Sequence, residues 1–244
     1  MSEPFLSIVI PAYNEALRIG ATLKKVRQYL ESRNFPGELI VVDDGSTDRT
    51  PDLLRDFQEQ YPAMRILQNE VNRGKGFSVR RGVLEARGGL ILFTDSDLSA
   101  PIEETNKLLA ALESSGAAAA VGSRALKRRL IGVHQPWHRE FAGRGFNLLV
   151  RLLTGLKIRD TQCGLKLFRR AATRRAFELQ RVRGFGFDPE VLFLVERFGG
   201  QVVEVPVRWN DSPATKVRFL RDSAGMFLDL VALRWRALTG QYKG

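Results

Sequence analysis

The sequence contains a single cysteine, Cys163, in 244 residues. One cysteine excludes a disulfide bond within the chain and is typical of a reducing compartment, and we expect it to be a small buried residue. The only two histidines, His134 and His138, have Pro136 between them, which argues against a helical metal-binding pair. No apolar stretch approaches the roughly 18 residues of a spanning helix, so no transmembrane segment is predicted. The first residues also lack the basic stretch of a signal peptide.

Charge is unevenly distributed along the chain. Residues 1–120 carry 14 Lys and Arg against 17 Asp and Glu, whereas residues 121–244 carry 24 against 10. The formal net charge of +11 therefore belongs to the second half. Such a basic region indicates a phosphate-bearing partner, which would be a nucleic acid, an anionic lipid or a phosphorylated substrate. It is also compatible with a charged, solvated surface that keeps the protein in solution.

The first 122 residues alternate short apolar runs with helical patterns. Continuously apolar runs, typical of strands covered on both faces, occupy residues 6–10, 38–42, 64–67, 90–94 and 117–121. A helical spacing of apolar residues between the first two runs is formed by Ile19, Leu23, Val26 and Leu30. This alternation predicts a mostly parallel α/β sheet flanked by helices, in which ligands bind at the carboxyl ends of the strands.

Acidic residues follow three of these predicted strands. Glu15 comes after the first, Asp43 and Asp44 after the second, and Asp95 and Asp97 after the fourth. Bringing like charges together is unfavourable unless a cation or hydrogen-bond donors compensate, although Asp43 could instead cap the next helix. An Asp-x-Asp segment after a strand is typical of a site that binds Mg²⁺ or Mn²⁺ with a phosphate-bearing substrate. A polar turn that caps the following helix is the structural alternative.

Four segments together resemble glycosyltransferase family 2, whose catalytic domain has the nucleotide-diphospho-sugar transferase (GT-A) fold. They read PAYNE at residues 11–15, VDDGSTD at 42–48, NRGKG at 72–76 and TDSD at 94–97. Later segments are similar to the polyprenyl-phosphate branch of that family: GSR at 122–124, DTQCGLK at 160–166, GFGFDPE at 184–190 and VPV at 205–207. The ending RWRALTG at 234–240 is most similar to the dolichyl-phosphate β-glucosyltransferases. The resemblance implies one domain over residues 1–244, with a nucleotide-binding half (1–122) and an acceptor-binding half (123–244).

The resemblance also implies roles for individual residues. A nucleotide-sugar site, for a UDP-sugar rather than a GDP-sugar, would comprise Pro11, Tyr13, Glu15, Asp43, Asp44, Lys75, Asp95, Ser96, Arg124 and Lys216. Asp97 would be the main ligand of a Mg²⁺ or Mn²⁺ ion, with Asp95 as a second ligand. Arg139 would hold the phosphate of a polyprenyl-phosphate acceptor. Asp97 and Arg139 are therefore the residues predicted to be catalytic.

The second half is less regular, and its helices bear on where the acceptor is met. Residues 124–140 are basic, contain glycine and proline, and are predicted to form a mobile loop. Residues 141–156 and 217–238 are predicted to form amphipathic helices with interspersed arginines. Such helices could lie in a membrane interface, or they could pack on the sheet or on each other. We expect them to face a membrane, with the protein peripheral on its cytoplasmic side.

The function expected from these features is that of an inverting hexosyltransferase. It would move glucose from UDP-glucose onto a polyprenyl (dolichyl or undecaprenyl) phosphate. One alternative is a GDP-mannose-dependent mannosyltransferase. Another is a family 2 enzyme with a hydroxyl acceptor, which would need Asp188 or Glu190 as a general base. A nucleic-acid-binding protein is the non-enzymatic alternative, but the sequence has no recognised nucleic-acid motif, and no nucleic-acid partner is expected.

Overall fold

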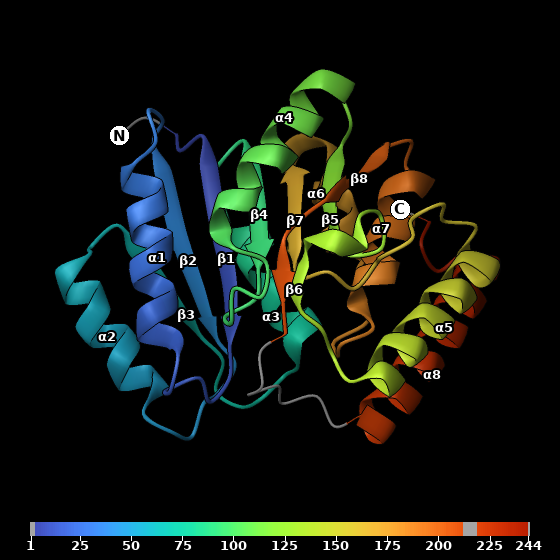
Figure 1. Cartoon of the computed structure of the whole chain (residues 1–244), viewed down its shortest axis with the longest axis horizontal. Coiled ribbons are helices and arrows are strands. Elements are labelled where there is room, and N and C mark those ends of the chain that lie inside the picture. The colour runs from blue at the N-terminus through green and yellow to red at the C-terminus, as the bar shows by residue number, and fades with distance from the viewer. Residues whose placement is uncertain (1–2, 212–218, 244) are drawn as a thin grey trace.

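The computed structural model describes residues 3–211 and 219–243, and the side chains of these residues except 219–222. A seven-stranded sheet forms the centre of the molecule in the order β3-β2-β1-β4-β7-β5-β8 (Figure 1). β7 is antiparallel to both of its neighbours, and the other pairs are parallel. The strands are β1 (Leu6–Ala12), β2 (Gly37–Asp43), β3 (Met64–Gln68), β4 (Leu90–Thr94), β5 (Ala119–Ser123), β7 (Leu165–Arg169) and β8 (Val202–Pro206). The predicted fold class is confirmed.

The central strands are apolar on both sides because helices cover both faces of the sheet. In β1, Leu6 and Ile8 contribute to one hydrophobic cluster, whereas Val9 contributes to the other. The first cluster is closed by α1 (Ile19–Glu31), α2 (Thr50–Gln60) and α4 (Thr105–Ser115). The second is closed on the opposite face by α3 (Lys75–Glu85), α6 (Arg170–Leu179) and α7 (Phe187–Arg197) (Figure 1). All five strands expected in the first half are present, each within two residues of its predicted bounds.

The segment after β5 differs from the loop expected over residues 124–140. It contains a short strand, β6 (Ile131–Val133), which pairs with β9 (Trp209–Asn210). Helix α5 (Trp137–Thr154) begins four residues earlier than predicted. Pro136 precedes the helix directly, and its restricted φ favours entry into a helical turn. The helix ends at Gly155, whose φ of 80° is a left-handed conformation that glycine adopts readily.

Helices α5 and α8 (Phe219–Leu238) lie side by side at one edge of the molecule (Figure 1). Each buries one stripe, including Val150 of α5 and Leu230 and Leu233 of α8. Their exposed large apolar side chains form the outer apolar surface, which comprises Trp137, Phe141, Leu148, Leu149, Leu152, Phe227, Leu228, Val231, Trp235 and Leu238. The helices thus pack on the protein and on each other, and still present an apolar face. Within the described residues, no helix combines the length and hydropathy needed to cross a bilayer.

Candidate active site

The carboxyl ends of three parallel strands meet at one edge of the sheet, because β2, β1 and β4 are consecutive in the strand order. Hydrogen bonds tie the loops after β1 and β2 together. Asn14 N donates to Ser46 Oγ (2.8 Å), and Asn14 Oδ1 accepts from Thr47 N (2.7 Å). Asn14 has a φ of 53°, a left-handed conformation that asparagine tolerates better than most residues. We call residues 13–15, 43–48 and 95–97 together the carboxylate rim.

Asp44 fixes the start of α3 against this rim. Its carboxylate accepts hydrogen bonds from Arg73 N (2.9 Å), Gly74 N (2.8 Å) and Asn69 Nδ2 (2.7 Å). Gly74 has a φ of 97°, and a Cβ there would come within 2.5 Å of a backbone oxygen, so only glycine fits. The next residue is Lys75, the first of α3. The local sequence therefore places a lysine at the rim through backbone contacts to a buried aspartate.

Asp43 and Tyr13 lie at the carboxyl ends of the neighbouring strands β2 and β1. Asp43 is fully buried, and its Oδ1 accepts from Ser46 N (3.1 Å). Its buried Oδ2 has no hydrogen-bond partner among the described residues, which is an unfavourable state that a ligand N–H or O–H would relieve. Tyr13 is 37% exposed, and Pro11 lies in β1 next to β2. This geometry suits a nucleoside with a polar edge and a stacking face.

Each aspartate after β4 faces a cation from another element. Lys75 Nζ lies 2.7 Å from Asp95 Oδ1, and Arg18 Nη1 lies 3.9 Å from Asp97 Oδ2. Glu15 also holds Arg18, with Nη2 donating to Oε1 over 2.9 Å. Burial and the nearby charge of Asp95 raise the pKa of Asp97. Burial opposes the charged form of Lys75, but the negative charge of Asp95 outweighs it and raises the pKa of the lysine.

Asp95 and Asp97 suit a divalent cation that also binds a diphosphate. The pKa of Asp97 is raised partly because a second carboxylate is close, and a shared cation would relieve that repulsion. Ser99 N donates to Asp97 Oδ1 (2.9 Å) and helps to orient the carboxylate. Among the described residues, no group of three His, Cys, Asp or Glu could hold a metal ion. Phosphate and water oxygens would therefore complete the coordination, as is common for Mg²⁺.

The loop before β7 joins the carboxylate rim to the second half of the chain. Asp95 N donates to Gly164 O (3.1 Å), and a Cβ on Gly164 would come within 1.9 Å of Asp95 Oδ2. A side chain at position 164 is therefore incompatible with this contact. Cys163 is fully buried, and burial raises the pKa of its thiol to about 12. Cys163 is a packed core residue rather than a nucleophile, as expected.

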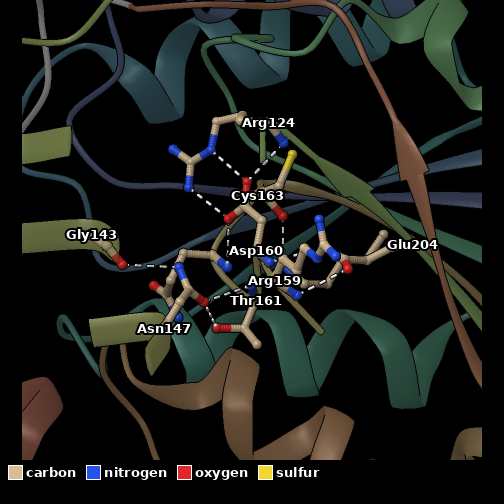
Figure 2. Close-up of polar contacts among 10 residues, drawn as sticks. Arg124, Gly143, Asn147, Arg159, Asp160, Thr161, Cys163 and Glu204 are labelled. Atoms are coloured by element: carbon tan, nitrogen blue, oxygen red, sulfur yellow. Dashed lines mark hydrogen bonds and ion pairs between the residues drawn. The ribbon is translucent and has the colours of Figure 1, made fainter. Parts of the chain in front are cut away.

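Arg124, directly after β5, is held by Asp160 in a forked ion pair (Figure 2). Nε donates to Oδ2 over 2.7 Å, and Nη2 donates to Oδ1 over 2.8 Å. The guanidinium also lies over the ring of Trp209, 5.2 Å from its centroid. Burial alone would raise the pKa of Asp160, but the charge and hydrogen bonds of Arg124 outweigh it and lower that pKa. The pair fixes the position of Arg124 without any ligand.

Arg124 and Asp160 line a cavity of about 90 Å³ against α5. Four more arginines contribute to its walls, and we call this cavity the arginine pocket: Arg128, Arg139, Arg144 and Arg159. The structure thus brings together Arg124, directly after β5, and Arg139, in the first turn of α5. Burial opposes the charged form of Arg124, but the charge and hydrogen bonds of Asp160 outweigh it and raise the pKa of the guanidinium. The loop before β7 links the arginine pocket to the carboxylate rim, because Asp160 holds Arg124 and Gly164 O accepts from Asp95 N.

The other residues that were predicted for the site lie in different surroundings. Ser96 is buried, and its carbonyl accepts from Thr22 Oγ1 (2.6 Å). Lys216 lies outside the described residues. The two carboxylates considered as general bases are both buried in contacts of the chain itself. Asp188 pairs with Lys166 Nζ (2.5 Å), and Glu190 accepts from Val182 N (2.7 Å) and from the hydroxyl of Tyr242.

Several residues of the site were not assigned a role from the sequence. Asn14 and Arg18 connect the loops of the rim. Asn14 lies in the PAYNE segment and Arg18 three residues after it, so this segment could have indicated both residues. Asp160 lies in the DTQCGLK segment, but only the fold shows that its partner is Arg124. The arginines of the pocket come from separate segments of a basic half, so no periodic pattern distinguishes them from surface arginines.

The sequence fits the model of glycosyl transferase family 2 over residues 7–177. This match covers more than half of the chain, and it agrees with the α/β sheet and with the carboxylates at its strand ends. The chain therefore belongs to glycosyltransferase family 2. Its curated relatives include dolichyl-phosphate β-glucosyltransferases. One from Trichomonas vaginalis is 37% identical over 95% of this chain and 71% of its own length. Those from Saccharomyces cerevisiae and Homo sapiens are 36% and 34% identical and cover 99% and 98% of this chain, each over 77% of the relative.

Solved structures share the fold at lower sequence identity. The UDP complex of glucosyl-3-phosphoglycerate synthase from Mycobacterium tuberculosis matches with a TM-score of 0.70 and 19% identity, over 95% of this chain and 80% of that one. A mannosyltransferase from Pyrobaculum calidifontis, in complex with GDP-Man and Mn²⁺, matches with a TM-score of 0.63 and 20% identity, over 97% and 65%. These similarities confirm the glycosyltransferase fold.

Proposed function

We propose that this chain is an inverting, metal-dependent glucosyltransferase that moves glucose from UDP-glucose to a polyprenyl phosphate. The observation that carries the proposal is the juxtaposition of the carboxylate rim with the arginine pocket, which the loop before β7 joins through the contacts of Asp160 with Arg124 and of Gly164 with Asp95. The names of the relatives, dolichyl-phosphate β-glucosyltransferases, support the sugar and the acceptor class. Structural neighbours with UDP-glucose and Mn²⁺, or with GDP-Man and Mn²⁺, support a nucleotide-sugar donor bound with a metal ion.

At the donor side, Asp97 and Asp95 are the proposed ligands of Mg²⁺ or Mn²⁺. When bound, the ion supplies positive charge to the diphosphate that leaves. Lys75 already lies beside Asp95 and adds a second positive charge at the same place. The unsatisfied Oδ2 of Asp43 and the exposed ring of Tyr13 are the groups proposed to receive the nucleoside. The protein thus positions the donor through carboxylates at one end and a polar, aromatic contact at the other.

The transfer itself is a direct displacement. An oxygen of the acceptor phosphate attacks the anomeric carbon from the face opposite the diphosphate. The new carbon–oxygen bond forms as the bond to the diphosphate oxygen breaks, and that electron pair leaves with the nucleoside diphosphate. An α-linked donor therefore gives a β-linked product. Arg139 would hold the attacking phosphate, and Arg124, predicted to contact the nucleotide sugar, would help to screen it from the charge of the diphosphate.

The pocket favours a phosphate over a hydroxyl as the nucleophile. A phosphate monoester carries about −1.5 to −2 charge at neutral pH and can attack without losing a proton. A hydroxyl acceptor would need a general base, and Asp188 and Glu190 are committed to buried contacts with Lys166 and with Val182 and Tyr242. Five arginines at one cavity supply the charge that a phosphate requires. This supports the phosphorylated acceptor over the hydroxyl alternative.

The outer apolar surface supports attachment to a membrane that holds the lipid acceptor. Trp137 and Phe141 belong to α5, the same helix that supplies Arg139 to the arginine pocket. Exposed arginines on these helices, such as Arg151 and Arg234, suit anionic headgroups. We place the protein peripherally on the cytoplasmic face of the membrane, because a single cysteine, Cys163, is typical of a reducing compartment.

The test is transfer with defined substrates. The purified chain is incubated with polyprenyl phosphate, Mg²⁺ or Mn²⁺, and a panel of UDP- and GDP-sugars. The mass of the lipid product is then determined by mass spectrometry. We expect a hexosylated polyprenyl phosphate from UDP-glucose, and its loss when a chelator removes the metal. A product formed only from GDP-mannose would overturn the donor assignment. No glycolipid with any donor would overturn the acceptor assignment.

A further inference from the structure

The charges in the arginine pocket are not all compensated in the same way. Arg124 is neutralised by Asp160, which is buried and holds it through both nitrogens of the fork. Within the described part of the chain, the side chains of Arg139 and Arg159 form no ion pair. The pocket therefore contains cations with a fixed partner and cations that are open to an anion.

Glu140 compensates Arg128 and Arg144 and also contacts His134, and it does so from the wall of the pocket. Its Oε2 accepts from Arg128 Nη2 (2.6 Å), and Arg144 Nη2 lies 3.6 Å from the same oxygen. Its Oε1 lies 2.6 Å from His134 Nδ1. Hydrogen bonds from His134 and Arg128 lower the pKa of Glu140, so it is an anion at neutral pH. One carboxylate thus occupies the centre of three basic side chains.

The position of Glu140 explains why these three partners can reach it. It lies in the first turn of α5, directly after Arg139 and one turn before Arg144. Arg128 comes from the short helical turn before β6, and His134 follows β6. The carboxylate therefore gathers basic residues from three segments around one wall of the pocket. The side chains of Glu140 and Arg128 are partly exposed or exposed, whereas Asp160, the partner of Arg124, is buried.

We propose that Glu140 is a built-in anion that occupies part of the phosphate-binding site, and that the phosphate of the acceptor displaces it from Arg128 and Arg144. The inference rests on the proposed function, because it assigns the arginine pocket to an acceptor phosphate. A carboxylate carries one negative charge, whereas a phosphate monoester carries nearly two and offers three acceptor oxygens. The ester can therefore compete for the same guanidinium groups, while a weaker monoanion cannot.

This arrangement lowers the affinity of the pocket for every phosphate-bearing anion. An arginine pocket without an internal anion would bind any anion and would be blocked by inorganic phosphate or sulfate. With Glu140 in place, each incoming anion must replace part-exposed ion pairs, which are individually weak. The acceptor retains the advantage because its lipid portion adds binding that a free phosphate or sulfate ion lacks.

The test compares Glu140→Gln with Glu178→Gln, using a short-chain isoprenyl phosphate as acceptor. Glu178 forms an ion pair of the same i, i+4 type with Arg174 (2.8 Å), on α6 and outside the pocket, so its loss should leave the kinetics unchanged. For Glu140→Gln we expect KM for the isoprenyl phosphate to fall about three- to tenfold, the scale of one or two lost part-exposed ion pairs. The KM for UDP-glucose should stay the same. Inhibition by inorganic phosphate should become stronger by a similar factor.

A merely structural role for Glu140 would not lower the acceptor KM. An unchanged or raised acceptor KM in Glu140→Gln, or unchanged inhibition by inorganic phosphate, would overturn the proposal. Glu140→Asp keeps the charge but shortens its reach, and it should fall between the wild type and Glu140→Gln. If the wild type transfers nothing to isoprenyl phosphate, the proposed function fails instead, and the two failures are thereby distinguished.

Discussion

The carboxylate rim and the arginine pocket organise their charges by different means. At the rim, Asp43 and Asp44 accept hydrogen bonds from backbone N–H groups of neighbouring loops. In the pocket, the charges are held mainly by side chains, as in the pairs Arg124–Asp160 and Arg128–Glu140. Backbone donors are set by the path of the chain, whereas side-chain pairs can be exchanged for a ligand. The part of the rim that Asp43 and Asp44 form is therefore a preformed cradle, whereas the pairs of Asp95 with Lys75 and of Asp97 with Arg18, like that of Glu140 with Arg128, can be exchanged for a ligand.

Among these changes, removing the carboxylate of Asp97, which is proposed to bind the metal ion, should reduce transfer the most. Asp97→Asn keeps the size of the side chain but removes the charge proposed to hold the cation. We expect kcat for transfer from UDP-glucose to fall by about 10³-fold or more, since charge stabilisation of this kind is the largest catalytic contribution. Circular dichroism should show an unchanged fold, and Asp52→Asn on exposed α2 is the matched control. Near-normal turnover in Asp97→Asn would refute the metal role.

The buried pair of the pocket should matter for stability as much as for transfer. Asp160→Asn leaves Arg124 without its countercharge, and we expect the free energy of unfolding to fall by about 3 kcal/mol at pH 7. The pKa of Asp160 is lowered by folding, so its contribution is present above the unfolded value of about 3.9 and is lost as the pH falls through the folded value.

Chemical denaturation of the wild type and Asp160→Asn across pH 7 to 3 checks this prediction. The difference between the two proteins should be constant near neutrality and should shrink below about pH 4. A difference that grows toward acid pH would mean that Asp160 is protonated in the folded protein.

Arg139→Ala should alter the kinetics for the acceptor and leave the kinetics for the donor nearly unchanged. We expect kcat/KM for the isoprenyl phosphate to fall about 10- to 100-fold, because a charged hydrogen bond to phosphate is lost. The KM for UDP-glucose should change little. Arg151→Ala, an exposed arginine on the same helix, provides the control. A loss of donor affinity in Arg139→Ala would mean that the residue belongs to the donor side.

The outer apolar surface should give the smallest effect of these changes. In flotation with anionic liposomes, we expect salt-sensitive association of the wild type, and a reduction of several-fold when Trp137 and Trp235 are both replaced by Ser. Leu17→Ser is a control, because Leu17 is an exposed apolar residue outside this surface. Absence of any association by the wild type would remove the membrane proposal.

The same contrast explains which parts of the molecule could be predicted from the sequence. The strands of the first half were predictable because successive residues such as Ile8 and Val9 are both apolar, one for each face of a covered sheet. The order of the strands then brings Asp43 and Asp95 to one edge, as their positions after strands indicated. Residues 124–140 were harder, because the pairing of β6 with β9 depends on a segment about 80 residues away.

The arginine pocket was predictable only in part. Arg139 and Arg124 were both identified through a family resemblance. The partners of Arg124 and Arg128, which are Asp160 and Glu140, became visible only in the fold, because charge pairs between separate segments leave no periodic trace in a sequence. Burial also decided the status of Cys163, whose pKa reflects surroundings that the sequence does not reveal.

The central claim is that the pocket beside the rim receives a phosphate as the nucleophile. The most direct measurement offers the purified chain two acceptors of equal chain length, an isoprenyl phosphate and the corresponding isoprenol, with UDP-glucose and Mn²⁺. We predict a glucosyl isoprenyl phosphate as the product and no detectable glucoside of the alcohol. Transfer to the alcohol at a comparable rate would contradict the account, because it would show that the arginines of the pocket do not select the acceptor.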